Sequence, residues 1–479
     1  MSRRNAVLSA LIPALVRTIP EILSWPYTVG FDPVGIYAVN AYQGVFLSMG
    51  IPQLFKTTSL YFLIVTLAYK ALGDPILAVK LLAPILNGLL GYTVYRYARS
   101  TGLGEKASLA AALISTTYFV GLRISWEMHR QMLATAMLLA YMELDKKPGR
   151  AAAAAQAALA FLIGWTHEFI TVILAAVAAA RLLSSKTPRE ALRAFTALPA
   201  GALLLYQVYT PETGALAVPA ERLAGVDPAY MLAYATGFLA YLYAPLLPLL
   251  AYGASTLRDR GTLAWTATCL AMTYSFLTGT TVLWFRWAIL LNYPASLAAG
   301  AGLEKLLEKP GRARKAALAL VAVYASMTAT YIALPPEQQF NKYFGDWNIY
   351  KHYMQTSMLQ NTLPLSDTPS AIQAVKWVDT LPGNKTLVLH EAFHSWAALY
   401  AKNSKLIRVG EHMLSAPNQY RPNTAEEILR AARREAATGA KVYTIWWVAG
   451  KGWYNMPNPP PGFKEVKRFG EIAVYEYQG

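Results

Sequence analysis

Long apolar runs separated by short polar loops fill residues 1–334, whereas residues 335–479 mix apolar and polar positions. A helix needs about 20 apolar residues to cross a bilayer core, so the runs of the first part predict membrane spans. In the second part short strand-like runs alternate with helical segments, which is typical of an α/β domain. The pattern therefore predicts a helical membrane domain at 1–334, a linker at 335–368 and an α/β domain at 369–479.

The apolar runs predict about eleven spans plus one interfacial helix. The expected spans are 5–24, 76–96, 107–123, 131–144, 151–166, 168–183, 191–209, 229–255, 261–279, 285–303 and 315–334. In the α/β domain we expect helices at 369–381, 391–402 and 424–438, and strands at 385–390, 405–409, 441–448, 464–469 and 471–477. The last two strands form a hairpin around Gly470.

Composition supports a membrane protein. The chain is 55% hydrophobic and 15% charged, whereas soluble domains carry about 25% charged residues. Lys and Arg exceed Asp and Glu by 16, but a chain this apolar is not a nucleic-acid binder, so the membrane explains the basic excess. The single cysteine, Cys269, excludes an intramolecular disulfide.

The placement of the basic residues decides the topology. If the N-terminus is cytoplasmic and the run 57–73 does not cross, most loop Lys and Arg residues face the inside. If that run crosses, the basic loops face outward, against the positive-inside rule. We therefore expect a multi-pass protein of the cell membrane with a cytoplasmic N-terminus, an outer interfacial helix at 57–73 and an extracytoplasmic C-terminal domain.

This topology gathers ionisable residues on the outer side of the membrane. They are Glu21, Asp32, Glu127, His129, Arg130, His167, Glu168 and Arg286. Ionisable groups at membrane depth are costly and usually mark a functional site. We interpret Glu21, Arg123 and Glu212 as loop-end residues among the lipid headgroups, and the others as candidate site residues.

Several motifs, taken in order along the chain, resemble the GT-C superfamily of membrane glycosyltransferases. They are Arg17 at the end of the first span, the loop Trp25–Tyr37 with Asp32, the interfacial helix after Pro52, Arg123–Arg130, and Phe285-Arg286-Trp287. The resemblance implies an enzyme similar to archaeal or bacterial oligosaccharyltransferases or mannosyltransferases. Such an enzyme moves a sugar or glycan from a polyprenyl-phosphate-linked donor to an extracytoplasmic protein, lipid or glycan acceptor.

The resemblance also implies roles for individual residues. Asp32 matches the acidic residue of the first loop, which serves as a base or metal ligand. Glu127 and His129 occupy the place of a second acidic pair that holds a divalent ion, Mg²⁺ or Mn²⁺. Arg286 matches an arginine that contacts the lipid phosphate. Glu-x-His replaces Asp-x-Asp here, and those ions prefer oxygen ligands, so a metal-free mechanism with Asp32 alone stays open.

The remaining candidates are assigned by their chemistry and position. Arg130 joins Arg286 as a ligand of the donor phosphate, because guanidinium groups match phosphate oxygens. His167 and Glu168 line the same site. In the C-terminal domain, 446–450 keeps two tryptophans of the Trp-Trp-Asp-Tyr-Gly signature of family oligosaccharyltransferases but lacks its aspartate, and we interpret 445–448 as a buried strand. No glycine-rich phosphate loop is found, which argues against nucleotide sugars.

One motif favours a different class of enzyme. His390-Glu391-Ala-Phe-His394 fits H-E-x-x-H, the signature of zinc metalloproteases, with Glu411 or His412 as the third ligand. Against it, the preceding residues are expected to form a strand that runs straight into the motif. A transporter is the other alternative, but transporter sites lie near the midplane and between internal repeats, and neither feature is evident here.

Overall fold

The computed structural model describes residues 3–209, 221–222, 227–256, 258–281, 283–345, 349–351, 353–410, 424–448 and 460–479. These residues divide into two compact units. The helical unit comprises Met1–Ile22, Val45–Ile64 and Lys80–Met358, and the C-terminal unit comprises Leu23–Gly44, Val65–Val79 and Leu359–Gly479. The sequence-based boundaries differ from these units, because the first loop and residues 65–79 group with the C-terminal domain.

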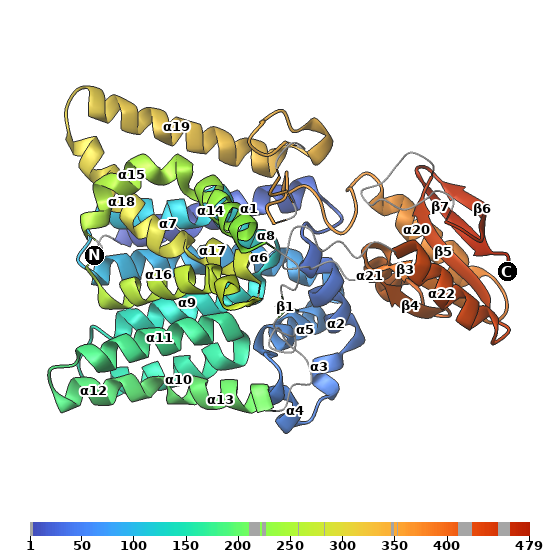
Figure 1. Cartoon of the computed structure of the whole chain (residues 1–479), viewed down its shortest axis with the longest axis horizontal. Helices are drawn as coiled ribbons and strands as arrows, with labels where there is room; N and C mark the ends of the chain where they lie inside the picture. Colours follow the sequence, from blue (N-terminus) through green and yellow to red (C-terminus); the bar gives the residue numbers. More distant parts are fainter. Residues whose placement is uncertain are drawn as a thin grey trace. The chain divides into compact units, whose positions relative to one another are not determined.

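Helices occupy every apolar run of the helical unit (Figure 1). They are α1 (Arg3–Leu23), α3 (Val45–Ser48), α4 (Ile51–Lys56), α5 (Leu60–Leu72), α6 (Pro75–Ser100), α7 (Glu105–Thr117), α8 (Phe119–Glu127), α9 (His129–Leu144), α10 (Arg150–Thr166), α11 (Glu168–Ser184), α12 (Pro188–Ala194), α13 (Leu198–Tyr209), α14 (Pro228–Tyr243), α15 (Leu247–Gly253), α16 (Arg260–Thr273), α17 (Trp284–Leu290), α18 (Asn292–Glu308) and α19 (Arg312–Ala333). A short β1–β2 pair joins Glu221–Arg222 to Thr280–Thr281.

The chain has the helices of a multi-pass membrane protein. Among the described residues, five helices are long and apolar enough to cross a bilayer, and α7 with α8 forms a sixth candidate that is bent by 54°. The other predicted spans are helical but shorter or interrupted. Helix α5 has 13 residues, about 20 Å at 1.5 Å per residue, which is too short for a core of about 30 Å.

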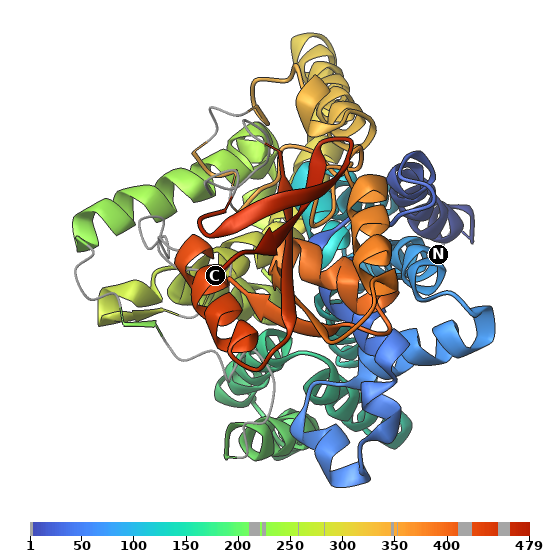
Figure 2. The same cartoon turned by 90° about the vertical axis from the view of Figure 1, so that its right-hand side faces the viewer.

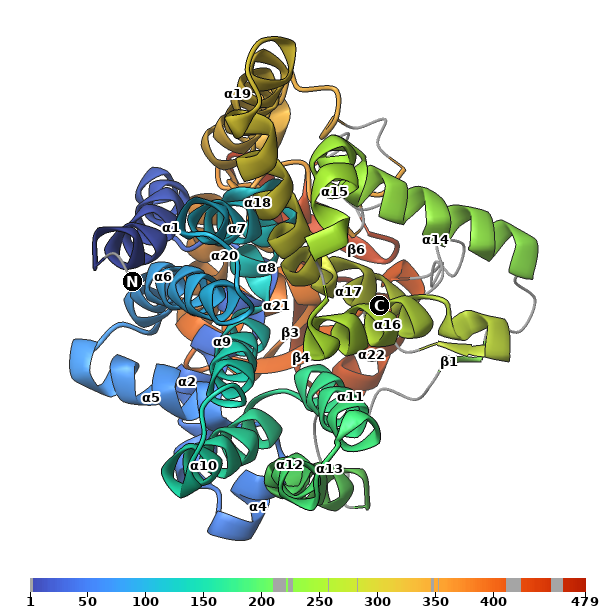
Figure 3. The ribbon, with the colours of Figure 1, turned by 90° about the vertical axis from the view of Figure 1, so that its left-hand side faces the viewer.

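Small residues let helices of this unit approach closely. Helix α18 lies beside α7 and α15 (Figure 3). A Cβ atom added to Gly300 would lie 2.5 Å from the Ala107 carbonyl oxygen, and one added to Gly253 would lie 1.7 Å from that of Ala298. Glycine is therefore required at both positions, as is common where membrane helices pack backbone to backbone.

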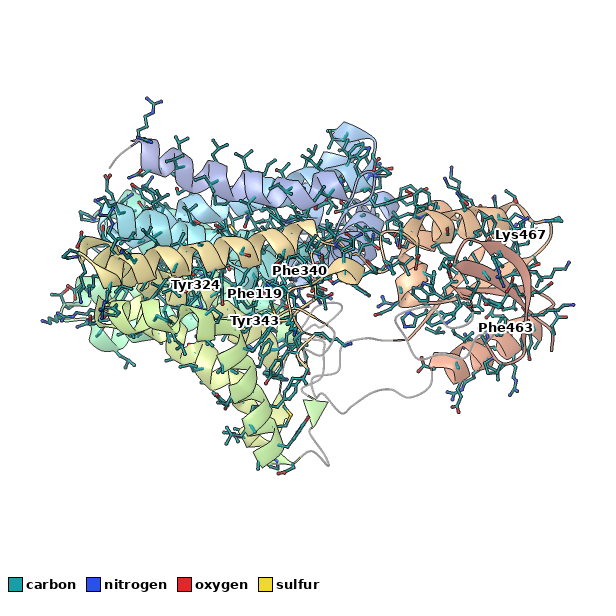
Figure 4. The ribbon with its side chains drawn as sticks, turned by 90° about the horizontal axis from the view of Figure 1, so that it is seen from above. Phe119, Tyr324, Phe340, Tyr343, Phe463 and Lys467 are labelled. Atoms are coloured by element: carbon teal, nitrogen blue, oxygen red, sulfur yellow. The ribbon has the colours of Figure 1, made fainter. Side chains whose placement is uncertain are left out.

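An aromatic cluster anchors the segment that follows α19. The Phe119 ring of α8 packs edge-on against Tyr343, with ring centroids 5.6 Å apart, and Tyr324 lies nearby (Figure 4). Two buried side chains of α8 then hold the backbone further along, because Arg123 Nε donates to the Tyr353 carbonyl (2.9 Å) and Trp126 Nε1 donates to that of Met358 (3.0 Å).

The C-terminal unit contains a five-stranded mixed sheet with the order β4-β3-β5-β7-β6 (Figure 2). Its elements are η1 (Pro33–Ala38), α2 (Val39–Gln43), α20 (Thr368–Thr380), β3 (Lys385–His390), α21 (Glu391–Tyr400), β4 (Lys405–Val409), α22 (Thr424–Ala436), β5 (Lys441–Trp447), β6 (Phe463–Phe469) and β7 (Ile472–Tyr477). Strand β3 is parallel to β4 and β5, and β7 is antiparallel to β5 and β6. The predicted strands and helices are confirmed, including the hairpin at Gly470, whose φ of 57° suits glycine.

Candidate functional site

Most of the predicted site residues lie at breaks between helices of the helical unit. Glu127 ends α8 and His129 begins α9, and Met128 separates them with φ −94° and ψ 52°. His167 separates α10 from α11 in an extended conformation, and its side chain accepts a hydrogen bond from Phe169 N (3.2 Å). Breaks of this kind turn polar side chains and backbone groups toward one region of a helical bundle.

Four of the predicted residues come together from three parts of the chain. Arg130 forms an ion pair with Glu168, with 3.3 Å between Nη2 and Oε2. Arg286 interacts electrostatically with both His167 and Glu168. The acidic side chain is 3% exposed, Arg130 is 17% exposed and Arg286 is half-buried. We call Arg130, His167, Glu168 and Arg286 the arginine cluster.

Neighbouring segments hold the arginine cluster in place. The Arg130 guanidinium also hydrogen-bonds the Thr58 hydroxyl and lies 5.3 Å from the centre of the Phe62 ring. On the other side, Trp287 stacks on Phe169 with ring centroids 4.7 Å apart. Phe169 follows Glu168 in the sequence and Trp287 follows Arg286. The segment at the start of α5 thus contacts Arg130, and the aromatic stack joins the helices that carry Glu168 and Arg286.

Two guanidinium groups in this cluster act electrostatically on one carboxylate. The cluster therefore keeps an excess of positive charge whatever the protonation state of His167. Guanidinium groups bind phosphate and carboxylate oxygens in a bidentate manner and stay charged at any physiological pH. The arrangement is chemically suited to hold an anionic group of a ligand.

Glu127 has a different environment. It forms a buried ion pair with Arg123, one helical turn earlier, at 2.5 Å, and the two side chains are 3% and 1% exposed. Arg123 in turn holds the backbone of Tyr353. The expectation that Arg123 lies among lipid headgroups is wrong, because the pair and the carbonyl compensate its charge inside the protein.

His129 belongs to a second buried network. Its Nε2 lies 3.1 Å from the Ser125 carbonyl and its Nδ1 lies 2.9 Å from the Tyr61 hydroxyl. Since a carbonyl only accepts, Nε2 donates there, and Nδ1 of the neutral ring accepts from Tyr61. Arg17 Nε donates to the same carbonyl (3.1 Å) and Arg17 pairs with Glu21 at 2.8 Å.

A second expectation, that Glu21 lies among the lipid headgroups, is also wrong. Glu21 is 4% exposed and also pairs with Lys80 at 3.3 Å, so it is not a headgroup residue. Glu212 lies outside the described residues. The sequence does carry one signal for the buried pairs. Arg17 and Glu21, like Arg123 and Glu127, have the i,i+4 spacing at which helix side chains meet. No comparable signal points to Thr58 or Tyr61.

Asp32 lies in the C-terminal unit. It precedes the π-helical segment η1, which packs against α21, and a Cβ atom added to Gly35 would lie 3.1 Å from Ser395 Oγ. Further contacts fix this loop on the domain, because Gly30 N donates to the Gln360 carbonyl (2.9 Å) and the Tyr27 ring packs edge-on against Trp396. Asp32 itself is half-buried.

The H-E-x-x-H residues do not form the helix face of a zinc protease. His390 ends β3 and caps α21, and its Nδ1 accepts a hydrogen bond from Ala392 N (3.2 Å). His394 lies within α21, so the two imidazoles do not occupy one helical face. Glu391 pairs with Arg408 at 2.5 Å. Both candidate third ligands, at 411 and 412, lie outside the described residues.

The paired tryptophans are buried in a strand, as predicted. Trp446 and Trp447 lie in β5 and are 0% and 1% exposed. Trp447 Nε1 donates to Asp367 (2.7 Å), which precedes α20. Both side chains therefore serve the core of the α/β domain, and the last residues of the 446–450 motif, 449 and 450, lie outside the described ranges.

The fold of this chain is similar to that of a solved structure. The arabinofuranosyltransferase AftD from mycobacteria matches with a TM-score of 0.54 and 15% identity, covering 100% of this chain and 40% of that chain. AftD is a membrane glycosyltransferase of the GT-C type. This chain has a GT-C fold. The match covers less than half of AftD, and the low identity limits the likeness to the fold.

An oligosaccharyltransferase from Archaeoglobus fulgidus is a second solved structure found by the comparison. It matches with a TM-score of 0.48 and 12% identity, covering 93% of this chain and 69% of that chain. No family model matches the sequence, and no curated protein matches it. The fold is assigned from the match to AftD alone, in agreement with the resemblance of the sequence motifs.

The donor groups in the helical unit of this GT-C fold do not suit a divalent cation. Glu127 is engaged by Arg123, and both imidazole nitrogens of His129 are hydrogen-bonded. Within the described ranges, no group of three or more His, Cys, Asp or Glu side chains is placed to hold a metal ion. We therefore derive no step through a metal from these residues.

Proposed function

We propose that this protein is a glycosyltransferase that takes a sugar or glycan from a polyprenyl-phosphate-linked donor and passes it to an extracytoplasmic acceptor. The arginine cluster is the observation that carries the proposal. Its four members were selected from the sequence as ionisable residues at one membrane face, and they meet in the helical unit. The GT-C fold supports the same class of reaction.

In this proposal Arg130 and Arg286 bind the phosphate of the donor. Arg130 and Arg286 are each partly exposed, whereas Glu168, which pairs with Arg130, is buried. Hydrogen bonds to a charged partner contribute about 1.5–3 kcal/mol each, and their strength increases as charge develops on the leaving phosphate. The cluster thereby lowers the barrier to departure of the polyprenyl phosphate.

Asp32 is the proposed base. The acceptor's nucleophilic atom attacks the anomeric carbon of the donor sugar and forms the new glycosidic bond. The bond between that carbon and the phosphate oxygen breaks, and its electron pair stays on the phosphate. The acceptor's proton passes to the Asp32 carboxylate.

A binding experiment tests the phosphate site without knowledge of the sugar. The full chain in nanodiscs is titrated with farnesyl phosphate and with farnesol, which has the same chain and lacks the phosphate. We expect the phosphate to bind more tightly, and Arg286→Gln to weaken that binding by about tenfold or more. Arg286→Lys should lose less. Arg260→Gln serves as the control, because Arg260 is exposed and donates to the Ser184 carbonyl away from the cluster.

A transfer experiment tests the base. Membranes that contain the protein receive a radiolabelled polyprenyl-phosphate-linked hexose, and label is followed into material that organic solvent does not extract. Asp32→Asn should abolish transfer and leave the affinity for farnesyl phosphate unchanged. Equal binding of farnesol and farnesyl phosphate would refute the phosphate site, and transfer by Asp32→Asn at the original rate would refute the base.

A further inference from the structure

An open apolar groove runs between α1 and α6 in the helical unit, apart from the arginine cluster. Its volume is about 740 Å³. The residues that shape it include Arg3, Ala6, Ala10, Ala14, Gly88 and Tyr92. Alanines one helical turn apart on α1 and a glycine on α6 leave the space that larger side chains would fill. Val7 and Leu11, which are 54% and 49% exposed, form an apolar wall.

The length of the groove fits one leaflet of a bilayer. From Arg3 to Ala14 it follows α1 for about 16 Å, at 1.5 Å per residue. The hydrocarbon core is about 30 Å thick, so the groove extends through roughly half of it. A transmembrane helix of a second copy would instead run along the whole of α1. A hydrocarbon chain that begins at one membrane surface and ends near the midplane matches this length.

One end of the groove is cationic. Arg3 is exposed and has no ion-pair partner among the described residues. Tyr92 lies at the same end, and its hydroxyl accepts a hydrogen bond from Arg96 (2.8 Å). Two acidic residues lie near this end, but each has another partner: Glu105 accepts from Asn5 (3.2 Å), and Glu143 pairs with Arg96. Arg3 remains as the cation that lines the groove. The mouth therefore complements a negative headgroup.

We propose that this groove binds one acyl chain of an anionic phospholipid, with the lipid phosphate at Arg3. The lipid lies in the leaflet where α1 begins, which the distribution of basic residues predicts to be cytoplasmic. Basic side chains near a membrane surface attract anionic lipids, and the apolar walls bury the chain. This lipid differs from the sugar donor in place and in role, so the inference does not depend on the proposed function.

The lipids that stay bound to the purified protein provide a test of this site. The full-length protein is purified from mixed membranes into detergent, and bound phosphatidylglycerol and phosphatidylcholine are counted by native mass spectrometry. We expect the protein to retain phosphatidylglycerol preferentially. Arg3→Gln should reduce that preference about fivefold, the effect of one basic residue near an anionic surface. Arg4→Gln is the matched control, because Arg4 does not line the groove.

Filling the groove tests the acyl chain. Ala10→Phe should abolish retention of phosphatidylglycerol, and Val7→Trp, which adds bulk at an exposed position of the wall, should do the same without disturbing the contact between α1 and α6. Leu15→Phe is the control, since Leu15 is exposed on α1 outside the groove. Equal retention of the two lipids by the unaltered protein, or retention that survives both filling variants, would overturn the proposal. So would a dimer that these variants dissociate while lipid retention stays constant.

Discussion

The buried pair of Arg123 and Glu127 permits a sharp test of whether Glu127 serves structure or chemistry. The two side chains are 1% and 3% exposed and their charged atoms lie 2.5 Å apart. Glu127→Gln keeps the size of the side chain and removes its charge, which leaves the guanidinium buried without its counter-ion. Loss of one partner of a buried pair destabilises proteins by about 3–5 kcal/mol.

Arg123 makes a second interaction, which Glu127 does not share. Its Nε donates to the Tyr353 carbonyl at 2.9 Å, and an unsatisfied buried carbonyl costs about 1–3 kcal/mol. Arg123→Met should therefore destabilise more than Glu127→Gln. The double variant removes both charges and retains only the cost of the carbonyl. A double-mutant cycle should accordingly give a coupling energy larger than the loss for Glu127→Gln alone, that is, above about 3 kcal/mol.

Unfolding of the purified protein in mixed micelles, as a function of the mole fraction of dodecyl sulfate, measures these differences. Glu143→Gln is the control, because Glu143 pairs with Arg96, which is 28% exposed, and such pairs contribute at most about 1 kcal/mol. If Glu127→Gln unfolds at the same dodecyl sulfate fraction as the unaltered protein and yet loses sugar transfer, Glu127 acts in the chemistry and the structural interpretation is wrong.

Two other predictions concern the C-terminal domain and the helix packing. Burial, and then the charge of Arg408, lower the pKa of His394 from 6.5 to about 4; the unfolded chain therefore binds the proton more tightly, and stability should fall by up to about 3 kcal/mol as the pH drops from 6.5 to 4. Thermal unfolding across that range should show the loss, and His394→Gln should remove this part of it. Gly253→Ala should destabilise by about 1–3 kcal/mol, since its Cβ would meet the Ala298 carbonyl oxygen at 1.7 Å, whereas Gly201→Ala, with nothing within 4 Å, should be neutral or slightly stabilising in the same micelle assay.

Much of the fold follows from hydrophobic periodicity. The apolar runs predicted helices at the observed places, and strand signals located β3 to β7, because both patterns reflect local burial. The sequence did not predict where one apolar run is broken into two helices. The run 107–123 reads as one span, but the chain bends by 54° between α7 and α8. No local pattern marked that bend, since packing against distant residues such as Tyr343 stabilises it.

The candidate site was likewise predicted from the sequence only in part. Sequence identified the arginine cluster as charged groups at one membrane face, because a charge in an apolar setting is conspicuous in any chain. It did not identify partners that lie far apart in sequence, such as Arg130 and Glu168. It also grouped Glu127 with the catalytic residues, although its i,i+4 spacing from Arg123 offered a structural explanation that the coordinates support.

The location of Asp32 gives the C-terminal domain a defined part in the proposed reaction. The loop that carries this residue folds as part of the α/β unit, with η1 against α21 and Tyr27 against Trp396. Trp396 in turn donates from Nε1 to the Thr362 hydroxyl at 3.0 Å, which joins the loop's contact surface to the segment before α20. The loop that carries Asp32 is thus held by the packing of the α/β domain.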